Sequence, residues 1–294
     1  MIVDTETKRP GVDEALSAPE QAHRWIENRP PSGWLPRLDL REFWGFRELA
    51  FALALKDLKV RYKQTFFGVA WSVLQPVIAV VVFSVIFGRL AGLPADGLPY
   101  PVFAYAAMAI WIYVSTSTST AALSLVDNRG LVSKVYFPRG LAPLAAIVPG
   151  LVDLGVALPI LAVLMIAYGV APGPELLLLP AWVAAAAAVA LAVGLWLSAL
   201  NVKYRDVKYI LGFGLQLWFF ASPVVYSSSL VEGDWKFVYA LNPMATVLGG
   251  FRWSVVGGPA PGSEALVSGL VVVLLLSGGL VYFHRVERYA ADLI

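Results

Sequence analysis

Long apolar runs separated by short polar segments make up most of this 294-residue chain. Six of the runs come close to or exceed the roughly 20 residues that a helix needs to cross a bilayer. Their approximate bounds are 66–88, 101–124, 143–168, 176–200, 208–226 and 265–283. Because these runs do not alternate apolar and polar residues as barrel strands do, they predict an all-α polytopic membrane protein with six transmembrane helices.

The chain before the first run divides into two parts. Residues 1–37 are charged and proline-rich and contain no apolar core of a signal peptide, so we expect a partly disordered tail. In residues 38–64, apolar side chains recur every three or four positions and are interrupted by Arg and Lys. This pattern predicts an amphipathic helix in the membrane interface, with a helix packed on protein alone as the alternative.

The distribution of positive charge predicts the orientation of the spans. With six spans, all but three of the 22 Lys and Arg residues fall on one side of the membrane, the exceptions being Arg89, Lys236 and Arg252. The positive-inside rule then places both termini in the cytoplasm, including the C-terminal residues 285–294.

The outer segment 227–256 is too long for a simple turn. Its apolar stretch is interrupted at Asn242, Pro243 and Arg252. Since a seventh span would move the C-terminus outside, the interruptions predict short re-entrant or outer helices between the fifth and sixth spans, near a pore mouth.

The sequence lacks the common motifs of catalytic and phosphate-binding sites. There is no Cys, both His residues lie outside the predicted spans, and no G-x-x-x-x-G-K-[ST] phosphate loop occurs. We therefore expect no metal site and no enzymatic activity of the chain itself. Active transport would draw on an ion gradient or on a separate ATPase. For an ion gradient, the candidate is Asp153 inside the third span, either as an ion site or as a hydrogen-bonded carboxylate.

The cytoplasmic segment 126–140, VDNRGLVSKVYFPRG, fits a docked ATPase. Asp127 and Asn128 predict the cap of a short helix, and Pro138 predicts its end. The apolar side chains are Leu131, Val135 and Tyr136, and the basic ones are Arg129, Lys134 and Arg139. An apolar centre with a charged rim suits a partner's cleft, and a positive-inside loop at lipid headgroups is the alternative.

Two features in the spans suit a hydroxyl-rich cargo. Residues 114–124, VSTSTSTAALS, carry small hydroxyl side chains that serve either close helix packing or contact with cargo. The spans also carry many aromatic residues, whose faces stack on sugar rings and which also form interfacial belts.

Five ordered motifs resemble one family, the membrane subunit of polysaccharide and polyol-phosphate export ABC transporters. The motifs are RYKQTFFGVAWSVLQP at 61–76, LVSKVYFPR at 131–139, NVKYRDVKYI at 201–210, SPVVYSSSLV at 222–231 (followed by YALNPMATVLGGFRW at 239–253) and FHRVERYAADLI at 283–294. Phe67 stands where the family usually has Leu. The family includes exporters of O-antigen, capsule and wall teichoic acid, and the resemblance covers about residues 40–294.

The resemblance implies a set of partners. Two copies of the chain would form one channel joined to two nucleotide-binding subunits, which would bind ATP and Mg²⁺, so this chain would hold no cofactor. The cargo would be a polysaccharide on undecaprenyl diphosphate or a related lipid. The location would be the bacterial cytoplasmic membrane, with no nucleic-acid partner. An ion-coupled carrier using Asp153 and an ABC exporter of a small lipid or drug are the alternatives.

The resemblance also implies residue roles. Coupling to the ATPase would involve Asp127, Asn128, Arg129, Leu131, Lys134, Val135, Phe137, Pro138 and Arg139. The substrate path would include Trp71, Trp111, Ser115, Ser119, Trp218, Phe219 and Tyr226. The headgroup entrance would use Arg61, Lys63 and Arg205, and the outer gate would use Asn242, Pro243 and Arg252.

Overall fold

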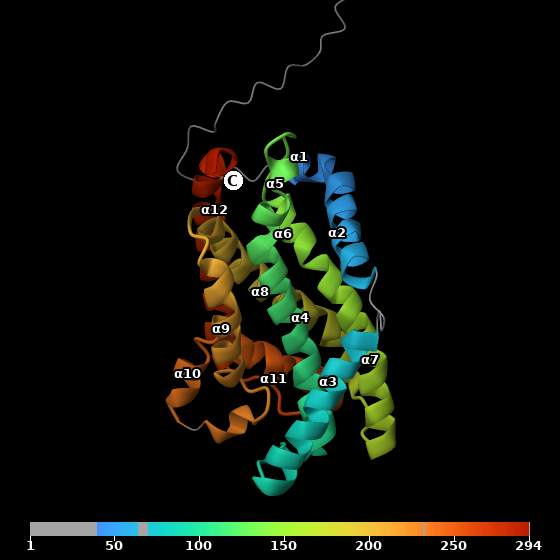
Figure 1. The fold of residues 1–294 in the computed structure, drawn as a ribbon. Helices are drawn as coiled ribbons and strands as arrows, with labels where there is room; N and C mark the ends of the chain where they lie inside the picture. Colours follow the sequence, from blue (N-terminus) through green and yellow to red (C-terminus); the bar gives the residue numbers. More distant parts are fainter. Residues whose placement is uncertain (1–39, 64–69, 232, 294) are drawn as a thin grey trace, which may run out of the picture. The chain divides into compact units, whose positions relative to one another are not determined.

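The computed structural model describes residues 40–63, 70–231 and 233–293, and Figure 1 shows them as a set of helices joined by short turns. The side chains of Leu40, of 70–73 and of 288–293 are outside the described part. The predicted tail, residues 1–37, also lies outside it. Within the described residues all regular structure is helical, which confirms the all-α class.

The helices follow one another in a simple order. They are α1 (Leu40–Gly45), α2 (Arg47–Tyr62), α3 (Ala70–Phe83), the π-helix η1 (Ser84–Leu90), α4 (Tyr100–Asp127), α5 (Arg129–Val132), α6 (Leu141–Ala146), α7 (Val148–Tyr168), the 3₁₀-helix η2 (Pro174–Leu178), α8 (Leu179–Lys203), α9 (Val207–Phe220), the 3₁₀-helix η3 (Ser228–Leu230), α10 (Trp235–Tyr239), α11 (Pro243–Val256) and α12 (Glu264–Leu293).

Four helical segments of the described chain are long and apolar enough to cross a membrane. They are Tyr100–Asp127, Leu141–Tyr168, Pro174–Lys203 and Glu264–Glu287. They coincide with the second, third, fourth and sixth predicted spans. The first and fifth predicted spans coincide with two shorter apolar helices, Leu74–Leu90 and Val207–Phe220. The chain is therefore a multi-pass membrane protein.

The helix of the fifth predicted span, 208–226, is shorter than the sequence pattern suggested. Helix α9 ends at Phe220 and covers 14 residues, about 21 Å at ~1.5 Å per residue. Pro223 explains the early end, because it lacks a backbone N–H and disfavours helical geometry at Ser222.

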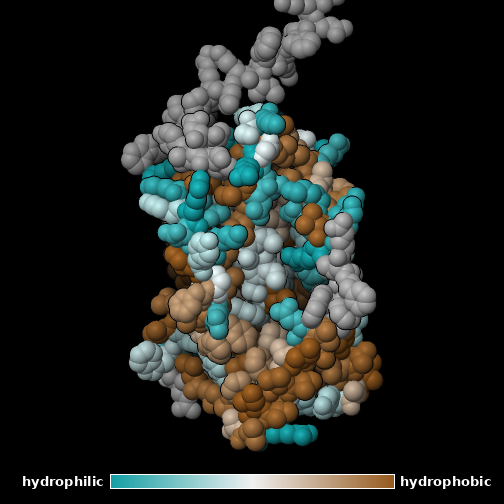
Figure 2. Space-filling model, in the orientation of Figure 1, coloured by the Kyte–Doolittle hydropathy of each residue, from teal (hydrophilic) through white to brown (hydrophobic). Residues whose placement is uncertain are grey.

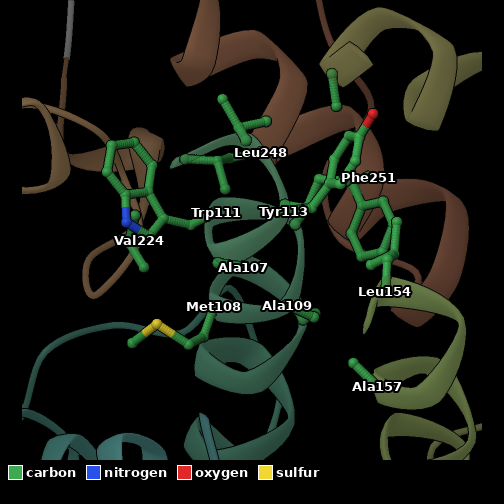
Figure 3. Packing of buried hydrophobic residues seen from close by; sticks show 14 of the residues in the cluster. Ala107, Met108, Ala109, Trp111, Tyr113, Leu154, Ala157, Val224, Leu248 and Phe251 are labelled. Carbon is green, nitrogen blue, oxygen red and sulfur yellow. The ribbon is translucent and has the colours of Figure 1, made fainter. Parts of the chain in front are cut away.

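Helix α4 lies at the centre of the helices and is buried along most of its length (Figure 1). It packs against α3, α6, α7, α8, α9 and α11. Figure 3 shows Tyr113 of α4 beside Leu154 of α7 and Phe251 of α11, with Trp111 on the other side of α4 near Val224. At the contact with α8, a Cβ on Gly194 would lie 2.6 Å from the Ala121 Cβ, so only glycine permits this approach.

The interfacial segment forms two helices instead of the single one predicted over 38–64. Helix α2 buries Leu53 and Ala54 against Ala145 of α6, and Figure 1 shows α2 beside α7. Elsewhere on the segment, Phe51 is 69% exposed, as is Val60, while Trp44 of α1 is 71% exposed. The segment therefore packs on protein and still presents large apolar side chains outward.

Large exposed apolar side chains on α3, α7, α9 and α12 show which surfaces need a non-aqueous environment. Examples are Val81, Ile166, Phe213 and Leu270. In the view of Figure 2, hydrophobic residues cover the end with α3 and the lower part of α7, and hydrophilic residues gather at the end with α1 and α5. Such extensive apolar surface is unfavourable in water and suits lipid or another protein chain.

Candidate functional site

Three of the predicted substrate-path residues form an aromatic cluster. The ring centroid of Trp111 lies 5.7 Å from that of Trp218 and 5.5 Å from that of Phe219, both in edge-on geometry. Phe219 also lies 6.0 Å from Phe83 of α3. The cluster thus joins α3, α4 and α9. Trp111 is only 6% exposed, so it forms the buried part of this cluster.

The predicted gate residue Asn242 connects this cluster to the outer helices. Its side-chain oxygen accepts from Trp218 Nε1 at 2.8 Å and from the Met244 backbone N–H at 3.1 Å. Its amide nitrogen donates to the Ala221 carbonyl and the Ser222 hydroxyl, each at 3.0 Å. Asn242 is therefore the N-cap of α11, and Pro243 follows at the first helical position, where a missing N–H costs nothing.

An apolar groove of about 990 Å³ lies where the predicted path and gate meet. Trp218, Trp235 and Tyr239 line it together with Asn242 and Pro243. The remaining predicted path residue of this region, Tyr226, bonds its hydroxyl to that of Tyr239 at 2.8 Å. The groove is thus walled by aromatic rings with a few polar groups, a common composition for binding sites.

The two predicted path serines lie on α4 and are half-buried. Ser115 donates to the Ile112 carbonyl within its own helix. The neighbouring hydroxyls face other helices: Thr120 donates to the Ala146 carbonyl at 2.9 Å, and Ser117 donates to the Ile147 carbonyl. Helix packing therefore accounts for part of the hydroxyl run, and Ser119 lies outside that packing role. The side chain of Trp71 falls outside the described residues.

Arg252, the third predicted gate residue, is a buried cation that is 4% exposed. Its Nε donates to the Phe103 carbonyl at 3.2 Å and its Nη2 donates to the Val224 carbonyl at 2.7 Å. The guanidinium carbon also lies 3.6 Å from the centroid of the Phe103 ring. Arg252 thereby fixes α11 to α4 and to the turn after α9.

In the cytoplasmic segment 126–140, the helix is shorter than predicted and is capped differently. Helix α5 contains only Arg129–Val132, and Asp127 is the last residue of α4. The Asn128 side chain makes no capping bond to α5. It donates instead to the Ser124 carbonyl at 2.8 Å and accepts from Lys56 Nζ of α2.

The same segment separates into an exposed ridge and a buried base. Val135 is 47% exposed and Tyr136 is 49% exposed, and the exposed cations Arg129 and Lys134 lie on the same short stretch. We call these four residues the cytoplasmic ridge, after the side of the membrane that the distribution of positive charge predicts for them. The Tyr136 hydroxyl donates to Glu42 at 3.1 Å, and partial burial together with that carboxylate raises the pKa of Tyr136, so the donor proton is retained.

The base of the ridge is held by α1, α2 and α12. Phe137 is 3% exposed and shares a buried cluster with Val132, against which Phe43 and Leu131 pack. Arg139 donates to the Glu287 carbonyl of α12. Pro138 lies between these two anchors. The sequence alone did not distinguish the more buried Leu131 and Phe137 from the exposed Val135 and Tyr136. All four are apolar or aromatic and lie within seven consecutive positions.

The predicted headgroup residues do not come together. Arg61 forms an ion pair with Asp153 of α7, and the Tyr62 hydroxyl donates to the same carboxylate. Lys63 follows α2 and is exposed, whereas Arg205 is exposed in the turn between α8 and α9. Figure 1 shows α2 and α9 on opposite sides of α4. Sequence reasoning missed Tyr62 and the pairing of Asp153, since the partners are about ninety positions apart.

No group of three or more His, Cys, Asp or Glu residues able to hold a metal ion occurs among the residues that the structure describes.

The arrangement is that of a helical transport subunit: an aromatic-lined groove at one end, an exposed ridge at the other, and packed spans between. A model of the ABC-2 type transporter family matches residues 48–256. The chain therefore belongs to the ABC-2 type transporter family.

Curated relatives match nearly the whole chain. The O-antigen export system permease protein RfbA of Myxococcus xanthus is 31% identical over 259 residues, which cover 86% of this chain and 98% of that protein. A protein of the same name from Klebsiella pneumoniae is 23% identical over 254 residues, covering 84% of this chain and 95% of the relative.

Proposed function

We propose that this chain is the channel-forming permease subunit of an ATP-driven exporter that moves a cell-surface polysaccharide of the O-antigen type across the cytoplasmic membrane. The observation that carries the proposal is the match along 98% of an O-antigen export permease from Myxococcus xanthus. The chain provides a path and moves with its partner, and it performs no covalent chemistry. Differential contacts with cargo and partner in two conformations are its contribution.

Two copies of the chain form the channel in this proposal, with six spans each and both termini in the cytoplasm. The exposed apolar faces of α3 and α9 support a chain-to-chain interface, because Phe213, Leu217 and Phe220 project from α9 without a covering helix among the described residues. In the assembled channel α3 and α9, although short, act as the first and fifth spans, and α1 and α2 rest in the inner membrane interface.

The ATPase subunits, which bind ATP and Mg²⁺, dock on the cytoplasmic ridge. An apolar centre, Val135 and Tyr136, with Arg129 and Lys134 at its rim matches the anatomy of a protein interface. The base transmits the motion, since Phe137 and Arg139 connect the ridge to α1, α2 and α12. ATP-driven closure of the partners would therefore move several helices together.

The polysaccharide travels on a polyprenyl diphosphate carrier and contacts the groove at Trp218, Trp235 and Tyr239. Sugar rings present apolar C–H faces that pack on aromatic rings, while their hydroxyls bond to the Tyr239 hydroxyl. On the cytoplasmic side, the exposed Lys63 and Arg205, which do not come together, each offer a separate cation to the diphosphate. Arg61 holds Asp153 and takes no part in that attraction.

The ion pair of Arg61 with Asp153 weakens the alternative of an ion-coupled carrier. A transported cation would need the Asp153 carboxylate, which already binds a guanidinium and the Tyr62 hydroxyl. Both curated relatives carry a name that specifies O-antigen export, and this counts against an exporter of a small lipid or drug.

Gene deletion with complementation tests the proposed function. The deletion strain should lose its surface polysaccharide and accumulate the lipid-linked polymer in the cytoplasmic membrane, and the wild-type gene should restore both. Gel electrophoresis of the surface polysaccharide and extraction of the membrane glycolipid measure the two pools. A deletion strain with a normal amount of surface polysaccharide would refute the proposal.

A further inference from the structure

A second cavity, smaller and more polar than the aromatic groove, lies among the outer segments. It encloses about 210 Å³ and is formed by α10, α11 and the segments that precede α4 and α12. The polar groups used below are those of Asp96, Ser228, Lys236, Tyr239, Thr246 and Glu264. Asp96 and the distant residues 228–264 therefore converge on one polar pocket, which we call the outer pocket.

The outer pocket contains both hydrogen-bond acceptors and donors. Asp96 and Glu264 contribute carboxylates, Ser228 and Thr246 contribute hydroxyls, and Lys236 contributes an ammonium group. Carboxylates and hydroxyls in one small space are suited to a ligand that presents several hydroxyl groups.

Asp96 is held in an unusual conformation. Its φ of 53° is the one positive φ of a non-glycine residue in the described part of the chain. Its carboxylate accepts from the Ser227 hydroxyl at 2.6 Å and from the Ser229 hydroxyl at 2.9 Å. A strained backbone that persists because other contacts fix it is common at ligand sites. The bonds to Ser227 and Ser229 leave further acceptor capacity on the two oxygens.

The floor of the outer pocket is open because its residues are small. Ala240, Ala245 and Gly249 line it, and Ala245 and Gly249 are one helical turn apart on α11. A Cβ added at Gly249 would meet no heavy atom within 4 Å. Gly in a helix interior costs roughly 1 kcal/mol relative to Ala. Glycine at position 249 therefore leaves this part of the outer pocket open, although it makes helix α11 less stable.

We propose that the outer pocket binds a single sugar unit of the exported glycan on the outer side of the membrane. The ring of Tyr239 offers a stacking surface, and the carboxylates and hydroxyls accept from and donate to the sugar hydroxyls. Tyr239 and Val231 also line the aromatic groove, so the groove and the outer pocket are neighbours. This inference rests on the proposed function, which supplies the polysaccharide and the orientation.

Filling the pocket is the sharpest test, because Gly249 lines it and a Cβ added there meets no heavy atom within 4 Å. In Gly249→Leu the new side chain enters the open space, and leucine favours the helix. Gly155→Leu is the matched control: it lies on α7, also has no heavy atom within 4 Å of an added Cβ, and is far from the outer pocket in sequence. Both full-length variants are compared with the wild type in lipid nanodiscs.

The probe is the producing strain's own surface polysaccharide, freed from lipid by mild acid, and calorimetry measures its binding. We expect Gly249→Leu to weaken binding at least about tenfold, equivalent to about 1.4 kcal/mol. Gly155→Leu should stay within about twofold, and both variants should melt at or above the wild-type temperature. Glu264→Gln provides a second, milder change and should weaken binding without filling the pocket.

The outcomes separate the pocket from the proposed function. Equal binding by wild type and Gly249→Leu overturns the pocket assignment, as does a wild-type protein that restores surface polysaccharide in cells but binds none of the freed polymer. Binding that is lost equally in Gly155→Leu also overturns it, because the effect then has no relation to the pocket. A wild-type gene that restores no surface polysaccharide refutes the proposed function itself.

Discussion

Segment 126–140, predicted to be cytoplasmic, and segment 227–256, predicted to be outer, both connect apolar helices, and they differ in that the second buries a cation. In the cytoplasmic segment, Arg129 and Lys134 are exposed beside exposed apolar side chains. In the outer segment, Arg252 is 4% exposed and bonded to two backbone carbonyls. An exposed cation next to apolar surface is available to a partner, whereas a buried one fixes its own fold.

The difference also separates two kinds of aromatic residue. Tyr136 of the cytoplasmic ridge is 49% exposed, while its neighbour Phe137 is 3% exposed. Substitution of an exposed residue should change an interaction, and substitution of a buried one should change stability first. The four predictions that follow use this distinction, from the largest expected effect to the smallest.

Replacing the buried cation should have the largest effect. In Arg252→Met the carbonyls of Phe103 and Val224 lose charged donors and the stacked ring loses its partner. We expect a loss of about 3 kcal/mol or more, seen as a lower melting temperature in detergent and a poor yield. The matched control, Lys236→Met, removes an exposed cation of α10 and should melt like the wild type. An unchanged melting temperature in Arg252→Met would show that the buried cation is dispensable.

The ion pair of α2 and α7 should give the next largest effect. Arg61→Met leaves the mostly buried Asp153 carboxylate without its guanidinium, and the cost should be about 2 kcal/mol because Arg61 is partly exposed. The double variant Arg61→Met with Asp153→Leu should recover most of the loss, since no unpaired charge remains. Thermal unfolding of the single and double variants measures this. A double variant no more stable than Arg61→Met would contradict the pairing.

The exposed ridge should affect partner binding and spare the fold. Val135→Asp places a charge in the centre of the ridge, and we expect association with the ATPase to weaken at least about tenfold. Its melting temperature should stay near that of the wild type, whereas the comparison variant Phe137→Ala should lower the melting temperature because it leaves a cavity in the buried cluster. Co-purification and thermal unfolding measure the two effects. The account fails here if Val135→Asp retains full ATPase binding.

The rim charges should give the smallest effect. Lys134→Ala should weaken ATPase association about twofold and reduce its dependence on salt, because exposed ion pairs contribute little and are screened. Titrations of the ATPase at low and high salt measure both quantities. Lys208→Ala, an exposed cation of α9, is the control and should leave the salt dependence unchanged. A tenfold loss in Lys134→Ala would mean that the charge, and not the apolar centre, dominates the ridge.

Hydropathy predicted the long helices well because lipid imposes length and composition on a span. Tyr100–Asp127 and Leu141–Tyr168 follow the predicted second and third spans closely. Pro223 is a local signal that the fifth helix ends early, but the prediction gave more weight to the apolar run that contains it. The helix of segment 126–140 was expected to end at Pro138, but α5 ends at Val132, and Asn128 bonds a lysine of α2 and does not cap it.

The contacts of the candidate site were harder to predict, because each depends on residues distant in sequence. The partners of Asp153 lie in α2, and the acceptors for Arg252 lie in α4 and in the turn after α9. The cluster of Trp111 with Trp218 likewise joins two helices that no periodicity connects. Sequence motifs identified these residues as candidates. Their geometry shows which of them are buried and hold helices together and which lie on exposed surfaces.

The most direct test of the central claim is ATP-dependent transport of lipid-linked polysaccharide in sealed vesicles. Inside-out vesicles containing the permease and its ATPase are loaded with the glycolipid on the outer face, and a membrane-impermeant glycosidase reports what remains there. The account predicts that ATP protects the polymer over time with wild-type permease and that Val135→Asp abolishes the protection. Equal protection without ATP, or with Val135→Asp, would contradict it.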